Sequence, residues 1–185
     1  MCIAYLGEVS ELEKTPYLHQ DNHTSVNIRP LRLEDFDHVI KWSRDHTFCL
    51  ANDWELNRNK DELFEWWQHC VEMASADIIR LGIERKNTLI GYVDLANIKG
   101  HVAEMGIAIG DSALWGKGLG HDACVCAMTY ACTYLDITVF TAETHASNMR
   151  SRKMLERVGF KEVARKGSEV YLGVETPLIQ YKISL

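Results

Sequence analysis

AEMGIAIGDSALWGKGLGHDA, residues 103–123, is the most informative segment of the chain. Its first part, from Met105 to Ile109, alternates in the manner of a β-strand. After a short loop, Gly116, Gly118 and Gly120 open a long helix. Glycines let the backbone approach a ligand closely, and the first turn of a helix has free N–H groups. The segment therefore predicts an anion-binding cradle.

The charge of this cradle favours a pyrophosphate group. The helix dipole places partial positive charge at the helix start, and Lys117 adds a full charge. His121 lies in the first turn, where it could either donate to a phosphate or be solvated.

The glycines also allow two other interpretations, a dinucleotide-binding site and a structural turn. Gly118-x-Gly120-x-x-Ala123 fits the dinucleotide fingerprint G-x-G-x-x-G/A, but that fingerprint should follow its strand directly. Here six residues, 110–115, intervene, and the GK[ST] ending of a phosphate-binding loop is absent. A purely structural glycine turn is the other alternative.

Composition limits the class of protein. The 185 residues are 46% hydrophobic and 25% charged, which is typical of one globular domain and excludes a disordered chain. A net charge of -6 argues against a nucleic-acid partner. No apolar run approaches the ~20 residues that span a bilayer. The start of the chain does not resemble a secretory signal, so we expect a cytoplasmic protein without a membrane partner. The six cysteines show no CxxC pair, and we expect buried thiols and no metal site.

The chain divides into an N-terminal extension, residues 1–25, and a single domain, residues 26–185. The extension is expected to pack on the domain or on a partner subunit, so a homodimer is one arrangement that it allows. Polar FCLANDWELNR, residues 48–58, is expected to be a loop, and Ser147 to cap the last helix. We expect strands over 26–31, 78–84, 89–95, 102–109, 137–143, 160–165 and 178–183, and helices over 33–43, 59–74, 116–134 and 147–158.

The glycine segment resembles the GNAT superfamily of acyl-CoA-dependent N-acetyltransferases. The family motif is [R/Q]-x-x-G-x-[G/A], usually within a phrase such as YQGKGLG, and residues 115–120 read WGKGLG. Trp115 is the departure, because the family prefers Gln or Arg at that position. The phosphate contacts of the family are mostly made by backbone groups, so the resemblance still implies binding of acetyl-CoA as the acyl donor.

A second segment resembles the same superfamily independently. Residues 148–160 read NMRSRKMLERVGF, which is similar to the N-x-x-S-x-x-x-L-E-x-x-G-F signature of Rim-type enzymes that acetylate ribosomal-protein N-termini. The resemblance covers residues 26–185. It implies an α+β, three-layer fold, in which about four helices flank a mixed, mostly antiparallel sheet of about seven strands. A splayed gap between the fourth and fifth strands is expected to receive the thioester.

The resemblance implies direct attack of a primary amine on the thioester. An amine of pKa ~10.4 is only about 0.04% neutral at pH 7, so a base is useful. Residues 107–109 would line the pantetheine arm, through the N–H groups of Ile107 and Ile109 beside Ala108. Glu104, in the position of the catalytic glutamate of many relatives, is the predicted base, directly or through water. Asp94 is the second candidate.

The departing thiolate needs a proton. Many relatives use a tyrosine near the start of the L-E-x-x-G-F phrase, but this position is Leu155 here. Rim-type relatives carry a serine one turn earlier, which corresponds to Ser151. Asn148 is expected to bind the pantetheine or carbonyl groups near the gap.

The acceptor amine is less constrained by the sequence. The loop between the first two helices normally forms one wall of the acceptor pocket, and it carries Asp53, Trp54 and Glu55. Together with Asp94, these residues would suit a polyamine, an aminoglycoside or a peptide N-terminus. A non-catalytic acyl-CoA-binding module is the alternative, because Trp115 and the missing tyrosine could mark a decayed enzyme.

Overall fold

The structure is a computed structural model that describes residues 25–72 and 78–185. The predicted N-terminal extension thus lies outside the described residues, apart from Ser25. None of the helices in the described ranges is long and apolar enough to cross a membrane.

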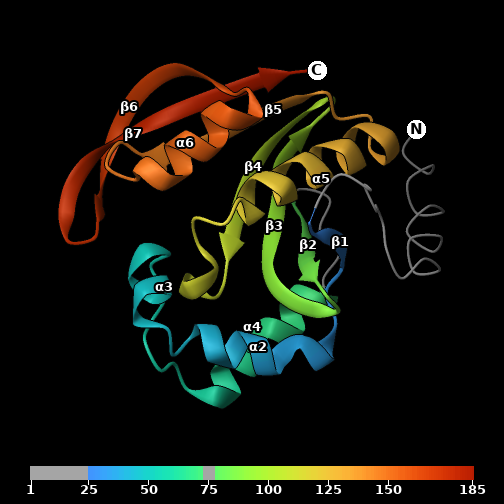
Figure 1. Ribbon diagram of the computed structural model, residues 1–185, viewed down its shortest axis with the longest axis vertical. Helices are drawn as coiled ribbons and strands as arrows, with labels where there is room; N and C mark the ends of the chain where they lie inside the picture. The colour runs from blue at the N-terminus through green and yellow to red at the C-terminus, as the bar shows by residue number, and fades with distance from the viewer. Residues whose placement is uncertain (1–24, 73–77) are drawn as a thin grey trace.

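Seven strands form one mixed sheet in the order β1-β2-β3-β4-β5-β7-β6 (Figure 1). Neighbouring strands are antiparallel except β4 and β5, which run parallel. The predicted sheet and its antiparallel meander from β2 to β4 are confirmed. The strands are β1 (Asn27–Pro30), β2 (Ile78–Arg85), β3 (Thr88–Lys99), β4 (Val102–Ile109), β5 (Val139–His145), β6 (Lys161–Tyr171) and β7 (Val174–Ser184).

Helices cover both faces of the sheet, which gives the predicted three layers. Figure 1 shows α5 and α6 crossing the sheet together, with α2, α3 and α4 gathered apart from them. Alternate residues of β4 join the two apolar cores: Met105 packs with α5, whereas Ala108 packs with α2 and α4. The α-helices of the described ranges are α2 (Phe36–Trp42), α3 (His46–Ala51), α4 (Lys60–Glu72), α5 (Leu119–Tyr134) and α6 (Met149–Val158).

The segment between the first two predicted helices is not a simple loop. Residues 46–51 form α3. Asp45 is its N-cap, and the Asp45 carboxylate accepts from the backbone N–H of Phe48 at 3.0 Å. Phe48 and Cys49 are buried in the core. The prediction of a polar loop over 48–58 was therefore wrong for residues 48–51. The polar residues around Phe48 and Cys49 gave no sign in the sequence that these two side chains are buried.

The start of α6 also differs from the prediction. The cap is Asn148, whose side-chain oxygen accepts from the N–H of Ser151 at 3.2 Å, and Ser147 lies outside the helix. Both residue types are good caps, so the sequence alone could not choose between them. The helix ends, as predicted, at Gly159, which has a φ of 114°.

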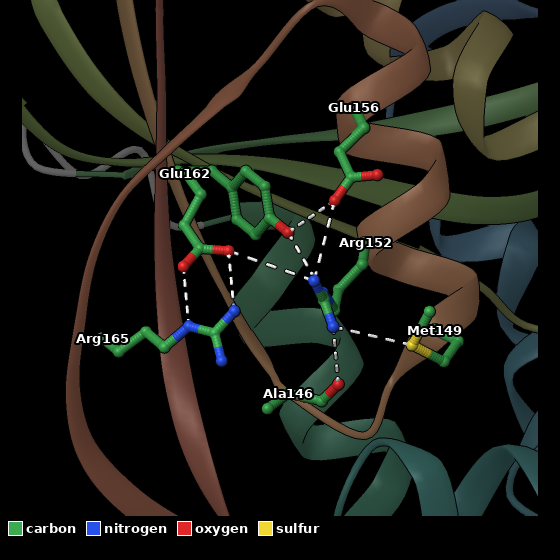
Figure 2. A network of polar contacts seen from close by, with 7 residues as sticks. Ala146, Met149, Arg152, Glu156, Glu162 and Arg165 are labelled. Carbon is green, nitrogen blue, oxygen red and sulfur yellow. Dashed lines mark hydrogen bonds and ion pairs between the residues drawn. The ribbon is translucent and has the colours of Figure 1, made fainter.

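The last two strands are longer than predicted and form a long hairpin. Figure 2 shows how Arg152 of α6 fastens that helix to the hairpin and to the preceding loop. Its guanidinium donates to the hydroxyl of Tyr181 at 3.2 Å and to the carbonyl of Ala146 at 3.3 Å, and lies 4.0 Å from Glu162. These contacts fix the helix that carries Asn148 and Ser151.

Candidate active site

The predicted gap between the fourth and fifth strands is present. β4 and β5 pair only at three positions, from Val102 with Val139 to Glu104 with Thr141. Beyond Glu104 the strands diverge, and a cavity of about 260 Å³ opens between them. It is lined by Met105, Gly106, Ile107, Ala142, Glu143, Thr144, His145, Asn148, Ser151, Met154, Leu155, Glu169 and Leu178.

Backbone groups of β4 face this gap. The N–H of Gly110 donates to Ile90 on β3, so alternation along an antiparallel ladder directs Ile107 and Ile109 toward the β5 side. The ladder with β5 has already ended there, so the N–H groups of Ile107 and Ile109 can bind an extended ligand. Ala108 is in the opposite phase, with its carbonyl oxygen against Gly91 on β3.

The glycine cradle lies at the wide end of the gap, where β4 leads into α5. Gly116 and Gly118 have φ angles of 75° and 84°, which favour glycine. A Cβ on either residue would meet nothing within 4 Å, so one side of the loop is open. Gly118 caps α5 without a side-chain hydrogen bond. The first-turn N–H groups, those of Leu119, Gly120 and His121, are therefore left for a ligand, which fits the predicted pyrophosphate site.

Trp115 contacts the end of β4 and the start of α6. Its indole N–H donates to the carbonyl of Ile109 at 2.7 Å. The guanidinium of Arg150 lies over its ring at 3.6 Å from the centroid, and Arg150 also hydrogen-bonds Tyr171 of β6. Trp115 thus links the cradle loop to β4 on one side of the gap and to α6 on the other.

The two charged residues predicted at the cradle differ in their surroundings. Lys117 is exposed in the loop. His121 directs Nδ1 toward the carboxylate of Asp122 at 3.2 Å, and Asp122 also accepts from the hydroxyl of Ser25 at 2.6 Å. Burial opposes the charge of Asp122, but these contacts outweigh it and lower its pKa. His121 is thus held beside a carboxylate rather than directed freely at the cradle.

Asn148 and Ser151 both line the cavity, as their predicted roles require. The side-chain oxygen of Asn148 is committed to the helix cap, so its Nδ2 is the group that could donate to pantetheine. Leu155, where many relatives have tyrosine, is buried in the cavity wall. Ser151 is therefore the hydroxyl that α6 presents to the gap.

Glu104 lies at the closed end of the gap. It is the last β4 residue paired with β5, and it is not part of the cavity lining. One of its carboxylate oxygens accepts from the amide of Asn97 at 2.8 Å. A substrate amine in the cavity would reach Glu104 most readily through water.

Asp94 is engaged in a charged cluster on β2 and β3. Its two oxygens accept from Arg80 at 2.6 and 2.7 Å. Burial opposes the charge of Arg80, but hydrogen bonds to Asp94 outweigh it and raise the pKa of Arg80. Arg80 also lies over the ring of Tyr92, whose pKa burial raises to about 12. Both carboxylate oxygens of Asp94 are therefore engaged by Arg80.

The three predicted acceptor residues on the α3–α4 connection are separate from the cavity lining. Trp54 packs edge-on against Phe48 and Trp66, with ring centroids 5.1 and 5.2 Å apart. Asp53 and Glu55 are exposed on either side of it. Trp54 thus has a packing role in the structure, and only its neighbours present charge to solvent.

Sequence reasoning missed three titratable residues of the cavity: Glu143, His145 and Glu169. Glu143 and His145 alternate on β5, and Glu169 comes from β6. Glu143 accepts from Gln180 at 2.6 Å. The spacing Glu-x-His at the end of a strand, three residues before Asn148, was a usable signal for the first two. Glu169 is distant in sequence and gave none.

Comparison with protein families identifies residues 25–161 as matching the acetyltransferase (GNAT) domain. A curated relative, the N-acetyltransferase 9-like protein of Nematostella vectensis, is 34% identical over 71 residues. This match covers 38% of the chain and 35% of the relative.

Solved structures share the fold at low sequence identity. The spermidine N-acetyltransferase of Vibrio cholerae, in complex with CoA and spermine, superposes with a TM-score of 0.73 and 21% identity, covering 86% of this chain and 95% of that one. A Salmonella typhimurium acetyltransferase that modifies the N-terminal serine of a ribosomal subunit protein gives a TM-score of 0.70 and 15% identity, covering 88% and 96%.

Proposed function

Because the chain belongs to the GNAT acetyltransferase domain family, we propose that it is an N-acetyltransferase that transfers the acetyl group of acetyl-CoA to a cationic primary amine. One observation carries the proposal: the glycine cradle, whose helix lacks a side-chain cap, follows β4 at the end where β4 and β5 have separated. An extended donor with a pyrophosphate at one end and an acyl group at the other fits both parts. The signature around Asn148 and Ser151 supports placing the protein among Rim-type enzymes.

The residues would divide the work along the donor. Backbone N–H groups of the cradle would hold the pyrophosphate, and those of Ile107 and Ile109 would hold the pantetheine arm. One of the latter would polarise the thioester carbonyl. Ser151, in the cavity lining, would supply a hydrogen bond or proton to the departing sulfur. The family resemblance predicts Glu104 as the base, directly or through water.

The charge of the cavity favours a cationic acceptor. Glu143 and Glu169 line it, and no lysine or arginine does so among the described residues. Beyond the cavity, Asp53 and Glu55 add exposed negative charge. Carboxylates would attract an ammonium group and raise its local concentration. The polyamine acceptor of the Vibrio neighbour suggests where to begin the search.

The first test is calorimetric titration of the purified protein with acetyl-CoA, NAD and ATP. We expect micromolar binding of acetyl-CoA alone. An amine screen by thiol release should then begin with spermidine, followed by an aminoglycoside and a peptide N-terminus. Binding without turnover on any amine would favour a non-catalytic acyl-CoA-binding module. Binding of NAD without acetyl-CoA would contradict the proposal.

A further inference from the structure

His145 carries a buried nitrogen that makes no hydrogen bond with the described residues. The residue ends β5 and lines the cavity beside Asn148 and Ser151. Its Nε2 is buried and accepts or donates no hydrogen bond among the described residues. Buried polar atoms without partners are rare in folded proteins, and each one calls for a reason. The carboxylate of Glu169, whose side chain is 64% exposed, lies next to Nε2, so a ligand in the cavity that displaced this carboxylate would reach the nitrogen.

The ring of His145 is held in place by β6. Tyr171 stacks on it with ring centroids 4.6 Å apart and planes 20° apart. Glu169 brings a carboxylate oxygen to 3.6 Å from Nε2, which is too long for a hydrogen bond but suits an ion pair with an imidazolium. The imidazole is therefore oriented by stacking on Tyr171, with the carboxylate of Glu169 beside its Nε2.

The other groups that face His145 are consistent with this role. On its own strand, Glu143 is a second carboxylate of the cavity. β7 contributes the apolar Leu178, and α6 contributes the uncharged Ser151. Arg150 is the nearby cation, and it hydrogen-bonds Tyr171 and lies over Trp115. The surroundings of the ring thus carry more negative than positive charge.

We propose that His145, rather than Glu104, accepts the proton of the attacking amine; this rests on the proposed acetyl transfer. The ammonium gives one proton to Nε2, and the neutral amine attacks the thioester carbon. A C–N bond forms, the C–S bond breaks, and the second amine proton passes to the sulfur, near Ser151. The products are the acetamide, CoA thiol and an imidazolium paired with Glu169, which returns its proton to solvent.

Position distinguishes the two candidate bases. His145 lies in the cavity wall with a nitrogen that makes no hydrogen bond among the described residues, whereas Glu104 lies outside the lining and already accepts from Asn97. A general base must come within hydrogen-bond reach of its proton or act through one water. Glu104 then contributes negative charge at the closed end of the gap.

The decisive kinetic test compares His145→Gln, Glu104→Gln and His69→Gln with spermidine as acceptor. His69 is an exposed histidine of α4 and controls for loss of an imidazole. We expect His145→Gln to lower kcat by about 10²-fold or more and to abolish its rise with pH, with the Kd for CoA unchanged. Glu104→Gln should keep that rise. A normal kcat and pH profile in His145→Gln would overturn the proposal, and loss of the rise in Glu104→Gln alone would return the role to Glu104.

A second variant and a spectroscopic measurement do not depend on the folding of His145→Gln. Glu169 is exposed at its side chain, so Glu169→Gln should fold normally and lower kcat severalfold while shifting the pH profile. In the NMR spectrum of the imidazole groups, the signal absent from His145→Gln should move when spermidine is added with CoA. A signal that does not move would count against His145. Failure of the wild-type protein to bind acetyl-CoA would instead refute the proposed function itself.

Discussion

Trp115 makes two contacts that a glutamine or arginine could not both make. The indole N–H binds the Ile109 carbonyl, and the ring face holds the guanidinium of Arg150. A cation over an indole contributes about 0.5–2 kcal/mol. Where the family has a polar side chain, Trp115 thus contacts both the end of β4 and Arg150 of α6. It leaves the glycine backbone of the cradle open.

Ser151 is the hydroxyl that α6 presents to the gap. If its hydroxyl serves the departing thiolate, Ser151→Ala should lower kcat by about 10²-fold and leave the Kd for CoA unchanged, because the pyrophosphate contacts come from another helix. Thiol-release kinetics and calorimetry measure the two quantities. Ser147→Ala is the matched control, since Ser147 is exposed just outside the same helix. An unchanged kcat would remove Ser151 from the chemistry.

A buried cluster of charged side chains anchors β1. Arg29 binds Asp35 at 2.7 Å and Glu84 at 2.6 Å, and all three residues are less than 9% exposed. Arg29→Met would leave two buried carboxylates without their cation, so we expect a loss of about 3–5 kcal/mol in the free energy of unfolding. Urea denaturation measures it. Lys41→Met, an exposed control on α2, should change little, and an equal midpoint for both variants would contradict the prediction.

Asp45 joins α3 to the loop after β4, and it links stability to pH. Its carboxylate accepts from the N–H groups of Phe48 at 3.0 Å and Ser112 at 2.8 Å. Burial opposes the charge of Asp45, but these hydrogen bonds outweigh it and lower its pKa. Its folded pKa thus lies below the unfolded value of about 3.9, so its contribution is complete above that value and lost as the pH falls through the folded pKa.

We therefore expect Asp45→Ala to lose about 1 kcal/mol in the free energy of unfolding at pH 7, and less as the pH falls below about 4. Urea denaturation at pH 7, 5 and 3.5 measures the difference from the wild-type protein. Glu65→Ala removes the same charge from an exposed position of α4 and serves as the control. A difference that grows toward low pH would show that the sign is wrong.

Local sequence signals predicted the elements that obey one strong pattern. The apolar stripe of α5, the glycine that ends α6 and the meander from β2 to β4 were all readable. α3 was not, because Phe48 and Cys49 are buried by partners on other elements. The full length of β6 and β7 depended on pairing between the two strands in the same way, whereas the cap at Asn148 was missed because Ser147 is an equally good cap.

Binding of a ligand to the folded protein should raise its thermal stability. A ligand at 100 times its Kd adds about 2.7 kcal/mol to the free energy of unfolding, which corresponds to about 5–10 °C in Tm for a chain of this size. We expect this shift with CoA and none with an equal concentration of NAD, as measured by thermal denaturation. Equal shifts for both nucleotides would contradict a cradle selective for CoA.

The candidate site shows where sequence reasoning ends. The cradle and the Asn148–Ser151 phrase are contiguous motifs, so their chemistry could be predicted. The His145–Glu169 pair unites β5 and β6, and the orientation of the ring depends on Tyr171 across the sheet. The engagement of Asp94 by Arg80 likewise needs two strands in register. Contacts of this kind follow from topology rather than from spacing.

The three-residue ladder between β4 and β5 has a mechanical consequence. It divides the sheet into two leaves, one of four strands and one of three, and each leaf has long ladders of its own. Twisting at this short ladder would widen the gap and leave the long ladders intact. If the proposed function holds, the angle between the two parts of the sheet would then help to set how large an acyl group the gap can receive.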